Sequence, residues 1–204
     1  MGTMFADVYN RFLGKITDDM YLEVTPEDTI RDLRSLLIDA IPGFEFPRKI
    51  IDDFNIETLV IKENEATESD FIIGVVWNTP EEEGDENIPD VYVERSHFNV
   101  DLTSEEINIL ALLMMCAWVQ RQVTSIENTR MKYSGSDFKM TSQANHLAKL
   151  LTLLSECQRQ SFHMQRLYKR RRINTETGHI ESNWDSFRNG IFGEYEVQYR
   201  NTKQ

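Results

Sequence analysis

The residue types that most often carry chemistry are few in this chain. It contains two cysteines, Cys116 and Cys157, and four histidines. A metal site built from these cysteines with His146 and His163 would need a close ligand pair, such as C-x-x-C or H-x-x-x-H, and none of them forms one. Both cysteines fall in apolar helical stretches, where free thiols commonly act as small core residues. We therefore predict no metal site and no disulfide.

The local motifs of common enzymes are also absent from the sequence. It has no phosphate-binding loop, dinucleotide fingerprint or nucleophile elbow. The acidic run Glu81–Glu83 lacks the alternating spacing and turn glycine of a calcium-binding loop, which indicates a solvated loop. We expect no enzymatic activity, no catalytic residue and no cofactor. An enzyme without a recognisable motif is the alternative.

A basic cluster is the strongest chemical signal in the sequence. Residues 130–172 contain 10 basic and 2 acidic residues, a balance of +8. Four of the basic residues follow one another directly after Tyr168: Lys169, Arg170, Arg171 and Arg172. Basic side chains neutralise phosphates whatever the base sequence, so a nucleic-acid-associated regulatory protein is one interpretation. Because a helix dipole favours cations at its C-terminus, helix chemistry explains part of the cluster.

Charge is distributed unevenly over the chain, whose formal net charge is −12. Residues 1–100 contain 23 acidic and 8 basic residues, a balance of −15, whereas residues 101–204 contain 11 acidic and 14 basic residues, a balance of +3. Such an acidic chain is an unusual DNA-binding regulator. The asymmetry favours head-to-tail contact between copies, with a generic solvated surface as the alternative.

The length and hydropathy of the chain limit its class further. With 204 residues, 40% of them hydrophobic, it can bury one good core, alone or with a small added module. The longest apolar run, Ile109–Val119, is shorter than the roughly 20 residues that cross a bilayer. Residues 1–16 lack the basic and apolar regions of a signal peptide. We expect a soluble protein made in the cytoplasm, with no membrane partner.

Helical spacing predicts two helices in an N-terminal part, residues 1–56. The first carries apolar residues at helical spacing over residues 5–16. The second begins with Thr25 as N-cap and Pro26 as the first helical residue, and it ends at Pro42-Gly43. Its apolar stripe contains Ile30, Leu33, Leu36, Leu37 and Ile41.

The pattern then changes to that of strands, in a predicted β module over residues 57–102. Alternation predicts strands at residues 59–62 and 71–77, which we interpret as a hairpin. The second strand should present its apolar residues on one face: Phe71, Ile73, Val75 and Trp77. An acidic loop follows, and then a third extended segment over residues 91–102.

Two long helices are predicted in residues 103–172. Thr103 and Glu106 form a capping box at the start of the first helix, and its nearly continuous apolar stretch, residues 107–119, indicates burial on most sides. Apolar side chains align along one side of the second helix: Leu147, Leu151, Leu154 and Cys157, with Leu150 adjacent. The two helices should pack as an antiparallel hairpin.

The last part of the chain, residues 173–204, is polar but rich in aromatic residues. Tyr195, Val197 and Tyr199 alternate with polar residues, which suits a strand added to the sheet of another subunit. We predict a docking arm, with an arm folded back on its own domain as the alternative. Aromatic groups bury a large area with few torsions to freeze, so they are the candidate interface anchors: Trp184, Phe187, Phe192, Tyr195 and Tyr199.

Together these elements predict an α+β fold that is mainly α. It is a helical bundle with a long central helical hairpin, an inserted β-hairpin module and an extended C-terminal arm. The segment that joins the two long helices, MKYSGSDFKMTSQANHLAKLLTL at residues 131–153, resembles the helix-turn-helix centre of head-to-tail connector proteins of tailed bacteriophages. The resemblance extends over residues 102–172 and includes no catalytic residue. It implies a structural virion protein of the neck, an adaptor or head completion protein.

The resemblance also implies partners and a location. Connector proteins of this kind form a ring, here of twelve copies, at the head-tail junction of the virion. The ring would bind the portal protein on one side and the next connector or tail protein on the other. Packaged DNA would pass through it, without specific binding, during genome packaging and ejection. An acidic lumen would repel the phosphates. We therefore place acidic residues of the N-terminal half on the channel, and residues 169–172 against an acidic partner surface.

Overall fold

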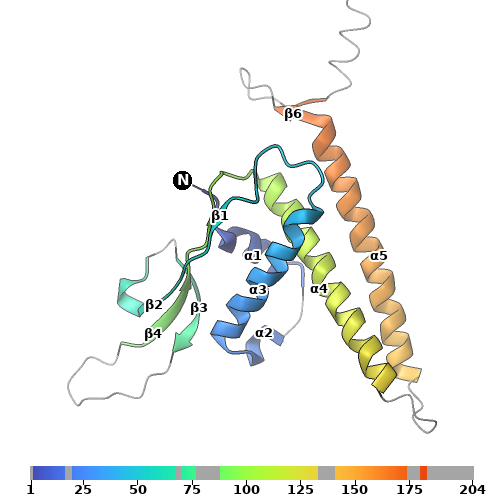
Figure 1. The fold of residues 1–204 in the computed structure, drawn as a ribbon, viewed down its shortest axis with the longest axis horizontal. Coiled ribbons are helices and arrows are strands. Elements are labelled where there is room, and N and C mark those ends of the chain that lie inside the picture. Colours follow the sequence, from blue (N-terminus) through green and yellow to red (C-terminus); the bar gives the residue numbers. More distant parts are fainter. Residues whose placement is uncertain are drawn as a thin grey trace, which may run out of the picture. The chain divides into compact units, whose positions relative to one another are not determined.

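The computed structural model describes most of the chain, namely residues 2–16, 20–67, 70–76, 88–132, 141–173 and 180–182. It contains two compact units, residues 1–161 and residues 162–204. The fold is α+β and mainly helical, as predicted. Figure 1 shows the helices and the small sheets of the first unit.

Three helices open the first unit: α1 (Phe5–Leu13), α2 (Met20–Glu23) and α3 (Pro26–Ala40), with the 3-10 turn η1 (Ile41–Gly43) after them. The prediction for α3 is confirmed in detail. The Thr25 hydroxyl accepts a hydrogen bond from the Asp28 amide at 3.3 Å, and Pro26 is the first helical residue. The apolar stripe predicted for α3 is buried. The short α2 was not predicted.

The β module contains β2 (Thr58–Lys62), the 3-10 turn η2 (Glu63–Glu65), β3 (Phe71–Val76) and β4 (Asp90–Glu94). The sheet order is β2-β4-β3, and both pairings are antiparallel. The predicted hairpin between the first two strands is therefore wrong, because β4 lies between them. As the central strand, β4 uses both of its edges for hydrogen bonds, whereas β2 and β3 each pair along one edge only.

A bulge in β3 changes which residues share a face. The register shifts between Ile72 and Gly74, so Ile73 has no direct partner on β4. The single face predicted for the aromatic and branched residues of this strand is therefore broken at Ile73. Trp77, the last residue of that predicted face, lies outside the described residues.

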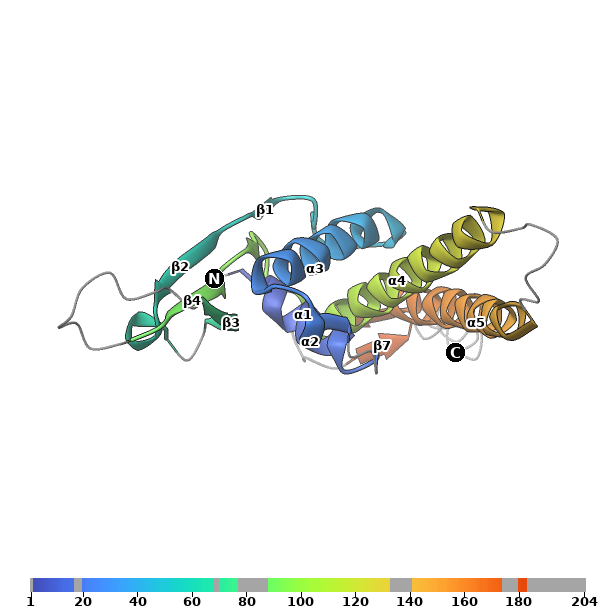
Figure 2. The ribbon, with the colours of Figure 1, turned by 90° about the horizontal axis from the view of Figure 1, so that it is seen from below.

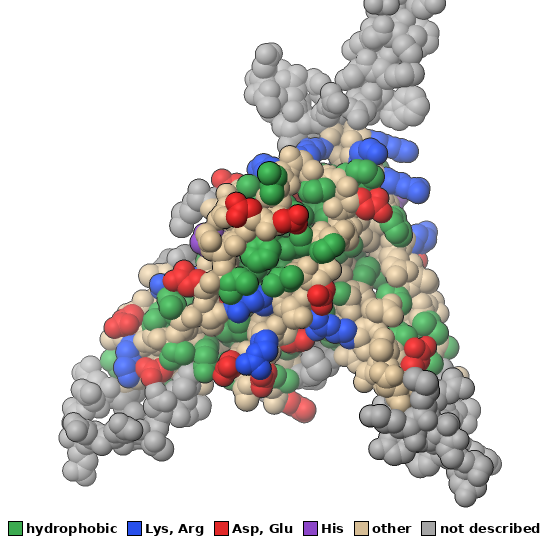
Figure 3. Space-filling view, viewed as in Figure 1, with side chains coloured by type: hydrophobic (Ala, Val, Ile, Leu, Met, Phe, Trp, Pro, Cys, Tyr) green, Lys and Arg blue, Asp and Glu red, His purple; other side chains and the backbone are tan. Residues whose placement is uncertain are grey.

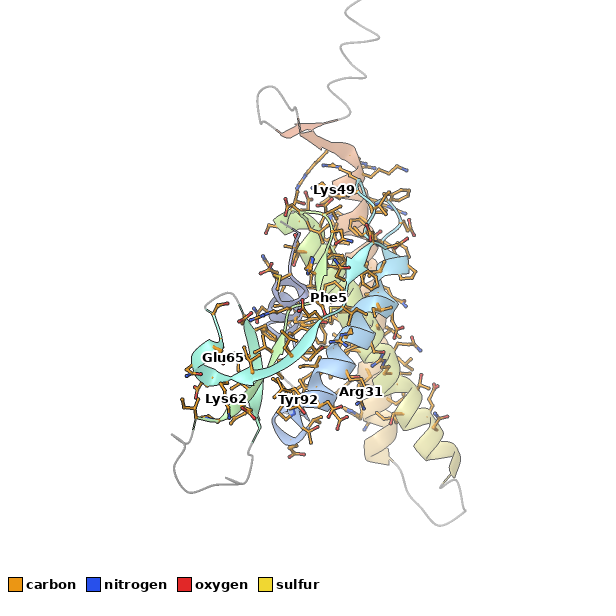
Figure 4. All side chains as sticks on the ribbon, turned by 60° about the vertical axis from the view of Figure 1, so that its left-hand side comes forward. Phe5, Arg31, Lys49, Lys62, Glu65 and Tyr92 are labelled. Atoms are coloured by element: carbon orange, nitrogen blue, oxygen red, sulfur yellow. The ribbon has the colours of Figure 1, made fainter. Side chains whose placement is uncertain are left out.

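Two very short strands, β1 (Phe54–Asn55) and β5 (His97–Phe98), pair next to the module. Phe5 of α1 contacts both of them, with ring centroids 5.5 Å from Phe54 and 4.7 Å from Phe98. Tyr9, one helical turn later, lies 6.1 Å from the ring of Phe71 in β3. In Figure 4, Phe5 lies where the module meets the helices, while Lys62 and Glu65 mark the opposite end of the module. This aromatic cluster joins sheet and helices into one core.

Hydrogen bonds hold the N-terminal segment against the chain around β5, which precedes the long helices. The Thr3 amide donates to the Val100 carbonyl at 3.1 Å, and the Phe98 amide donates to the Thr3 carbonyl at 2.9 Å. The approach is so close that a Cβ on Gly2 would lie 1.6 Å from the Phe98 carbonyl oxygen. Only glycine fits at that position.

The long helices are α4 (Ser104–Lys132) and α5 (Thr141–Arg170). The capping box at the start of α4 is confirmed: the Thr103 amide donates to the Glu106 carboxylate at 2.7 Å, and the Glu106 amide donates to the Thr103 hydroxyl at 3.3 Å. In Figures 1 and 2, α4 and the first part of α5 run side by side. A small core joins them, formed by Val119 and Val123 of α4 with Leu147 and Leu154 of α5.

The apolar stripe of α5 differs from the predicted one at a single position. Leu147, Leu154 and Cys157 are buried, but the side chain of Leu151 is 45% exposed. Leu150, which is partly buried, packs against the core in its place. The inward spacing is therefore alternately three and four residues, as in a two-helix seam.

By length and composition, residues 104–128 of α4 could cross a membrane. In the structure this helix packs against α1, α3 and η1. Several of its side chains are fully buried there, including Ile109, Leu110 and Met114. In the most apolar part of this stretch 39% is buried, so burial inside the protein accounts for part of the apolar composition of α4.

Within the second unit, the chain turns into a small hairpin when α5 ends. Strand β6 (Arg171–Ile173) pairs antiparallel with β7 (Ile180–Ser182), and Arg172 lies opposite Glu181. The predicted docking arm therefore begins with a short sheet of its own.

Candidate interaction surfaces

The basic cluster lies at the junction of α5 and β6. Lys169 and Arg170 occupy the last turn of α5, where the helix dipole favours them. The sequence pattern predicted all four cations at the end of the helix, but Arg171 and Arg172 belong to β6, because strand pairing with β7 begins there. The side chains of the first three residues of the cluster are exposed. They form a basic surface of the second unit.

The five aromatic residues proposed as interface anchors lie outside the described residues: Trp184, Phe187, Phe192, Tyr195 and Tyr199. Their role as a docking arm stays a prediction.

The first unit also exposes apolar side chains. Their exposure was not predicted from the sequence. In the β module, Val60 of β2 is 51% exposed and Ile72 of β3 is 46% exposed. They project from opposite faces of the sheet, because Val60 pairs with Tyr92 and Ile72 pairs with its neighbour Val93. Both lie on edge strands, which are the strands that most readily pair with another chain.

A second exposed apolar group lies on the connector between η1 and β2. Ile50 is 74% exposed and Ile56 is 51% exposed. Figure 3 shows hydrophobic side chains among charged ones on the face that is seen in Figure 1. On α5, Leu151 and Leu153 flank the buried stripe and are also exposed. The first unit therefore presents apolar groups on separate elements.

Acidic side chains lie at both ends of β2 in the β module. Glu57, Glu63 and Glu65 are exposed on or next to β2 and η2. Asp70 and Asp90 instead form ion pairs within the module, with Arg95 at 2.7 Å and with Lys62 at 3.0 Å. The Arg95 guanidinium holds the pKa of the Asp70 carboxyl well below its usual range. The exposed carboxylates give the module an acidic surface.

A buried polar cluster fastens the β module to the helices. Arg34 of α3 donates to the Glu94 carboxylate of β4 at 2.7 Å, and the Glu94 side chain is completely buried. The Thr58 hydroxyl donates to the same carboxylate oxygen at 3.2 Å and also contacts Arg34. Burial, with the Glu94 charge nearby, raises the pKa of the Tyr9 hydroxyl far above its ordinary value. Tyr9 is therefore a neutral group beside an ion pair.

A second polar contact fastens α4 to α3. The Arg121 guanidinium donates to Asp32 at 2.7 Å, to Ser35 at 2.9 Å and to Asp39 at 2.8 Å. The three acceptors lie three and four residues apart, so they share one side of α3. That spacing was visible in the sequence and could have identified a docking site for a cation.

The two cysteines meet between α4 and α5. Their Sγ atoms lie 2.7 Å apart, and the Cys157 thiol is also 3.6 Å from the Leu112 carbonyl. Both are free thiols; Cys157 is buried and Cys116 is half-buried. Among the residues that the structure describes, no group of three or more histidine, cysteine or acidic side chains is placed to hold a metal ion. The apolar helical stretches around these cysteines predicted separate core residues, and no local pattern predicted their contact.

Comparison with known proteins gives no relative for this arrangement. No protein-family model, no curated protein and no solved structure matches the chain.

Proposed function

We propose that this chain is a structural subunit of a tailed-bacteriophage virion, which assembles as a ring between the portal and the tail. The observation that carries the proposal is the set of exposed apolar side chains on separate elements of the first unit. Contacts between unlike surfaces of neighbouring copies would cover these side chains. Unlike contacts of this kind close into a ring when the rotation between copies fits.

Charge complementarity supports the same assembly. The β module presents the exposed carboxylates of Glu57, Glu63 and Glu65, while the second unit presents exposed Lys169, Arg170 and Arg171. An acidic surface on one copy and a basic surface on the next attract each other, and the same basic surface suits an acidic portal face. The acidic excess of residues 1–100 also suits a channel through which DNA slides without sticking.

The helical hairpin supports the resemblance to connectors. In that class a helical bundle makes the ring and extended segments reach the neighbouring rings. Here α4 and α5 supply the hairpin, and we propose the aromatic residues after Ser182, which lie outside the described residues, as the docking segment. DNA binding by the basic surface is the second candidate, and it is favoured by the same exposed cations.

The direct test is electron microscopy of the protein mixed with portal rings. We expect closed rings of this chain stacked on the portal. The variant with Lys169, Arg170, Arg171 and Arg172 all changed to Glu should stay folded and lose that stacking. The control changes four exposed cations elsewhere to Glu, for the same change in net charge: Arg31, Lys62, Lys149 and Arg159. Normal stacking of the cluster variant would contradict the placement.

A truncation tests the aromatic arm separately. Ending the chain after Ser182 keeps β6 and β7 paired and removes all five candidate anchors. We expect a large loss of affinity for portal rings with an unchanged melting temperature. Unchanged affinity would show that the arm does not dock. Retardation of free DNA that weakens with added salt, and that depends on the basic cluster, would favour the second candidate instead.

A further inference from the structure

We propose that Cys116 and Cys157 are a redox modification site, a dithiol that oxidises to an intramolecular disulfide and joins α4 covalently to α5. The inference does not depend on the proposed function. It starts from the contact between the two sulfur atoms, which lie 2.7 Å apart although 41 positions separate the residues in the sequence.

Helix packing holds the two sulfurs together. The core formed by Val119, Val123, Leu147 and Leu154 lies next to them along the same seam of the hairpin. The helices are therefore in register before any bond forms. A disulfide has a sulfur-sulfur bond of about 2.05 Å, so the two sulfurs must come closer than their present 2.7 Å before the bond forms.

The two thiols differ in a way that suits them to two different roles. Cys116 is half-buried, so a small oxidant can reach it, whereas Cys157 is only 2% exposed. The hydrogen bond between the two sulfurs lowers the pKa of Cys116 and, together with burial, raises the pKa of Cys157. The thiolate is the reactive form of cysteine, so Cys116 is the attacking group and Cys157 the resolving group.

Hydrogen peroxide is an oxidant that can accept the two electrons that the two thiols lose. The Cys116 thiolate attacks one peroxide oxygen, the oxygen-oxygen bond breaks, and the released hydroxide takes a proton to leave as water. Cys116 is then a sulfenic acid. The Cys157 sulfur attacks the Cys116 sulfur, the sulfur-oxygen bond breaks, and a second water leaves with the thiol proton. Two thiols have lost two electrons in total, and the peroxide has gained them.

Closing this bond has a predictable effect on the fold. A disulfide restricts the unfolded chain more when it closes a longer loop, and 41 positions separate these two cysteines in the sequence. The hairpin could then no longer separate while the rest of the chain stays folded. The oxidised protein should melt roughly 5–15 °C above the reduced protein.

The test uses the full chain before and after treatment with hydrogen peroxide. Thiols are counted with a maleimide in denaturant, so that burial of Cys157 does not resemble oxidation. We expect two reactive thiols before treatment and none after it, a mass loss of two hydrogen atoms in the monomer, and recovery of both thiols with dithiothreitol. The melting temperature should rise on oxidation and fall again on reduction.

The variants Cys116→Ser and Cys157→Ala provide the control. Each variant contains a single cysteine and cannot form the intramolecular bond, so neither should show a rise in melting temperature after peroxide. Because the wild-type comparison needs no variant, misfolding of either one leaves the test intact. Two reactive thiols after treatment, sulfinic acid in place of the bond, or a bond between two copies would each overturn the proposal.

Discussion

Arg34 of α3 and Glu94 of β4 form an ion pair of 2.7 Å in which the Glu94 carboxylate is completely buried. The pair lies where the β module meets the helices, so it couples two parts that are 60 positions apart in the sequence. One Glu94 oxygen and the Nε atom of Arg34 have no hydrogen-bond partner. The carboxylate therefore depends heavily on the one guanidinium group.

Arg34→Met should destabilise the protein by about 3–5 kcal/mol, because it leaves the Glu94 charge buried without its cation. Urea unfolding at neutral pH measures the loss. The matched control is Arg31→Met, one turn earlier on the same helix, where the arginine is 70% exposed and pairs with Glu27. The control should cost less than about 0.5 kcal/mol. Equal losses would contradict the coupling role of Arg34.

Asp70 should make the stability of the β module depend on pH in the acidic range. Its folded pKa is lowered by Arg95, so its contribution is complete above the unfolded value of about 3.9 and is lost as pH falls towards the folded value. The urea midpoint of Asp70→Asn should therefore lie below that of the wild type from pH 7 to about pH 5, and the difference should shrink below about pH 4. Asp52→Asn, at an exposed site, should follow the wild type throughout. A constant difference for Asp70→Asn would refute this cause.

The seam of the helical hairpin can be tested at two adjacent leucines. Leu154 is 9% exposed and belongs to the core between α4 and α5, so Leu154→Ala should cost about 2–5 kcal/mol in unfolding free energy. Leu153 is 38% exposed, and Leu153→Ala should cost clearly less. Both variants keep the same helix propensity, so the difference reports packing alone. Similar losses would mean that the seam is placed wrongly.

Gly74 should not tolerate a side chain. A Cβ at this position of β3 would lie 2.4 Å from the Cγ of Pro26, which belongs to a rigid ring at the start of α3. Gly74→Ala should therefore cost about 1–3 kcal/mol, since strand and helix must move apart. At Gly14 the nearest atom to an added Cβ is 3.4 Å away, and Gly14→Ala should be nearly neutral. Thermal unfolding of the two variants separates these cases.

Local signals in the sequence were sufficient to predict the main helices. Thr25 with Pro26, and Thr103 with Glu106, mark helix starts through hydrogen bonds within a few residues. The order of the strands depends on contacts over longer distances, and alternation alone did not predict it. Leu59 and Ile72 both pair with Val93, and the alternation of each strand is compatible with pairing to the other.

The candidate sites also differ in whether local sequence or long-range contacts determine them. The basic cluster was visible because its residues are consecutive. The contact between Cys116 and Cys157 depends on the register of α4 against α5. The packing of side chains along the seam determines that register, and the residues next to either cysteine do not. The hydrogen bonds of Arg121 to its acceptors on α3 join residues more than 80 positions apart. The spacing of those acceptors along α3 could nevertheless be seen in the sequence.

The hydrogen bonds that tie Thr3 and Phe5 to Ser96, Phe98 and Val100 have a consequence for synthesis. The start of α1 can form these hydrogen bonds only after the segment that contains β5 has left the ribosome. Until then α1 and α3 leave the exit tunnel with apolar faces uncovered, in the period when nascent chains are most exposed to chaperones and to aggregation. The burial of both helices is completed only by α4, which follows β5 in the sequence and packs against α1 and α3.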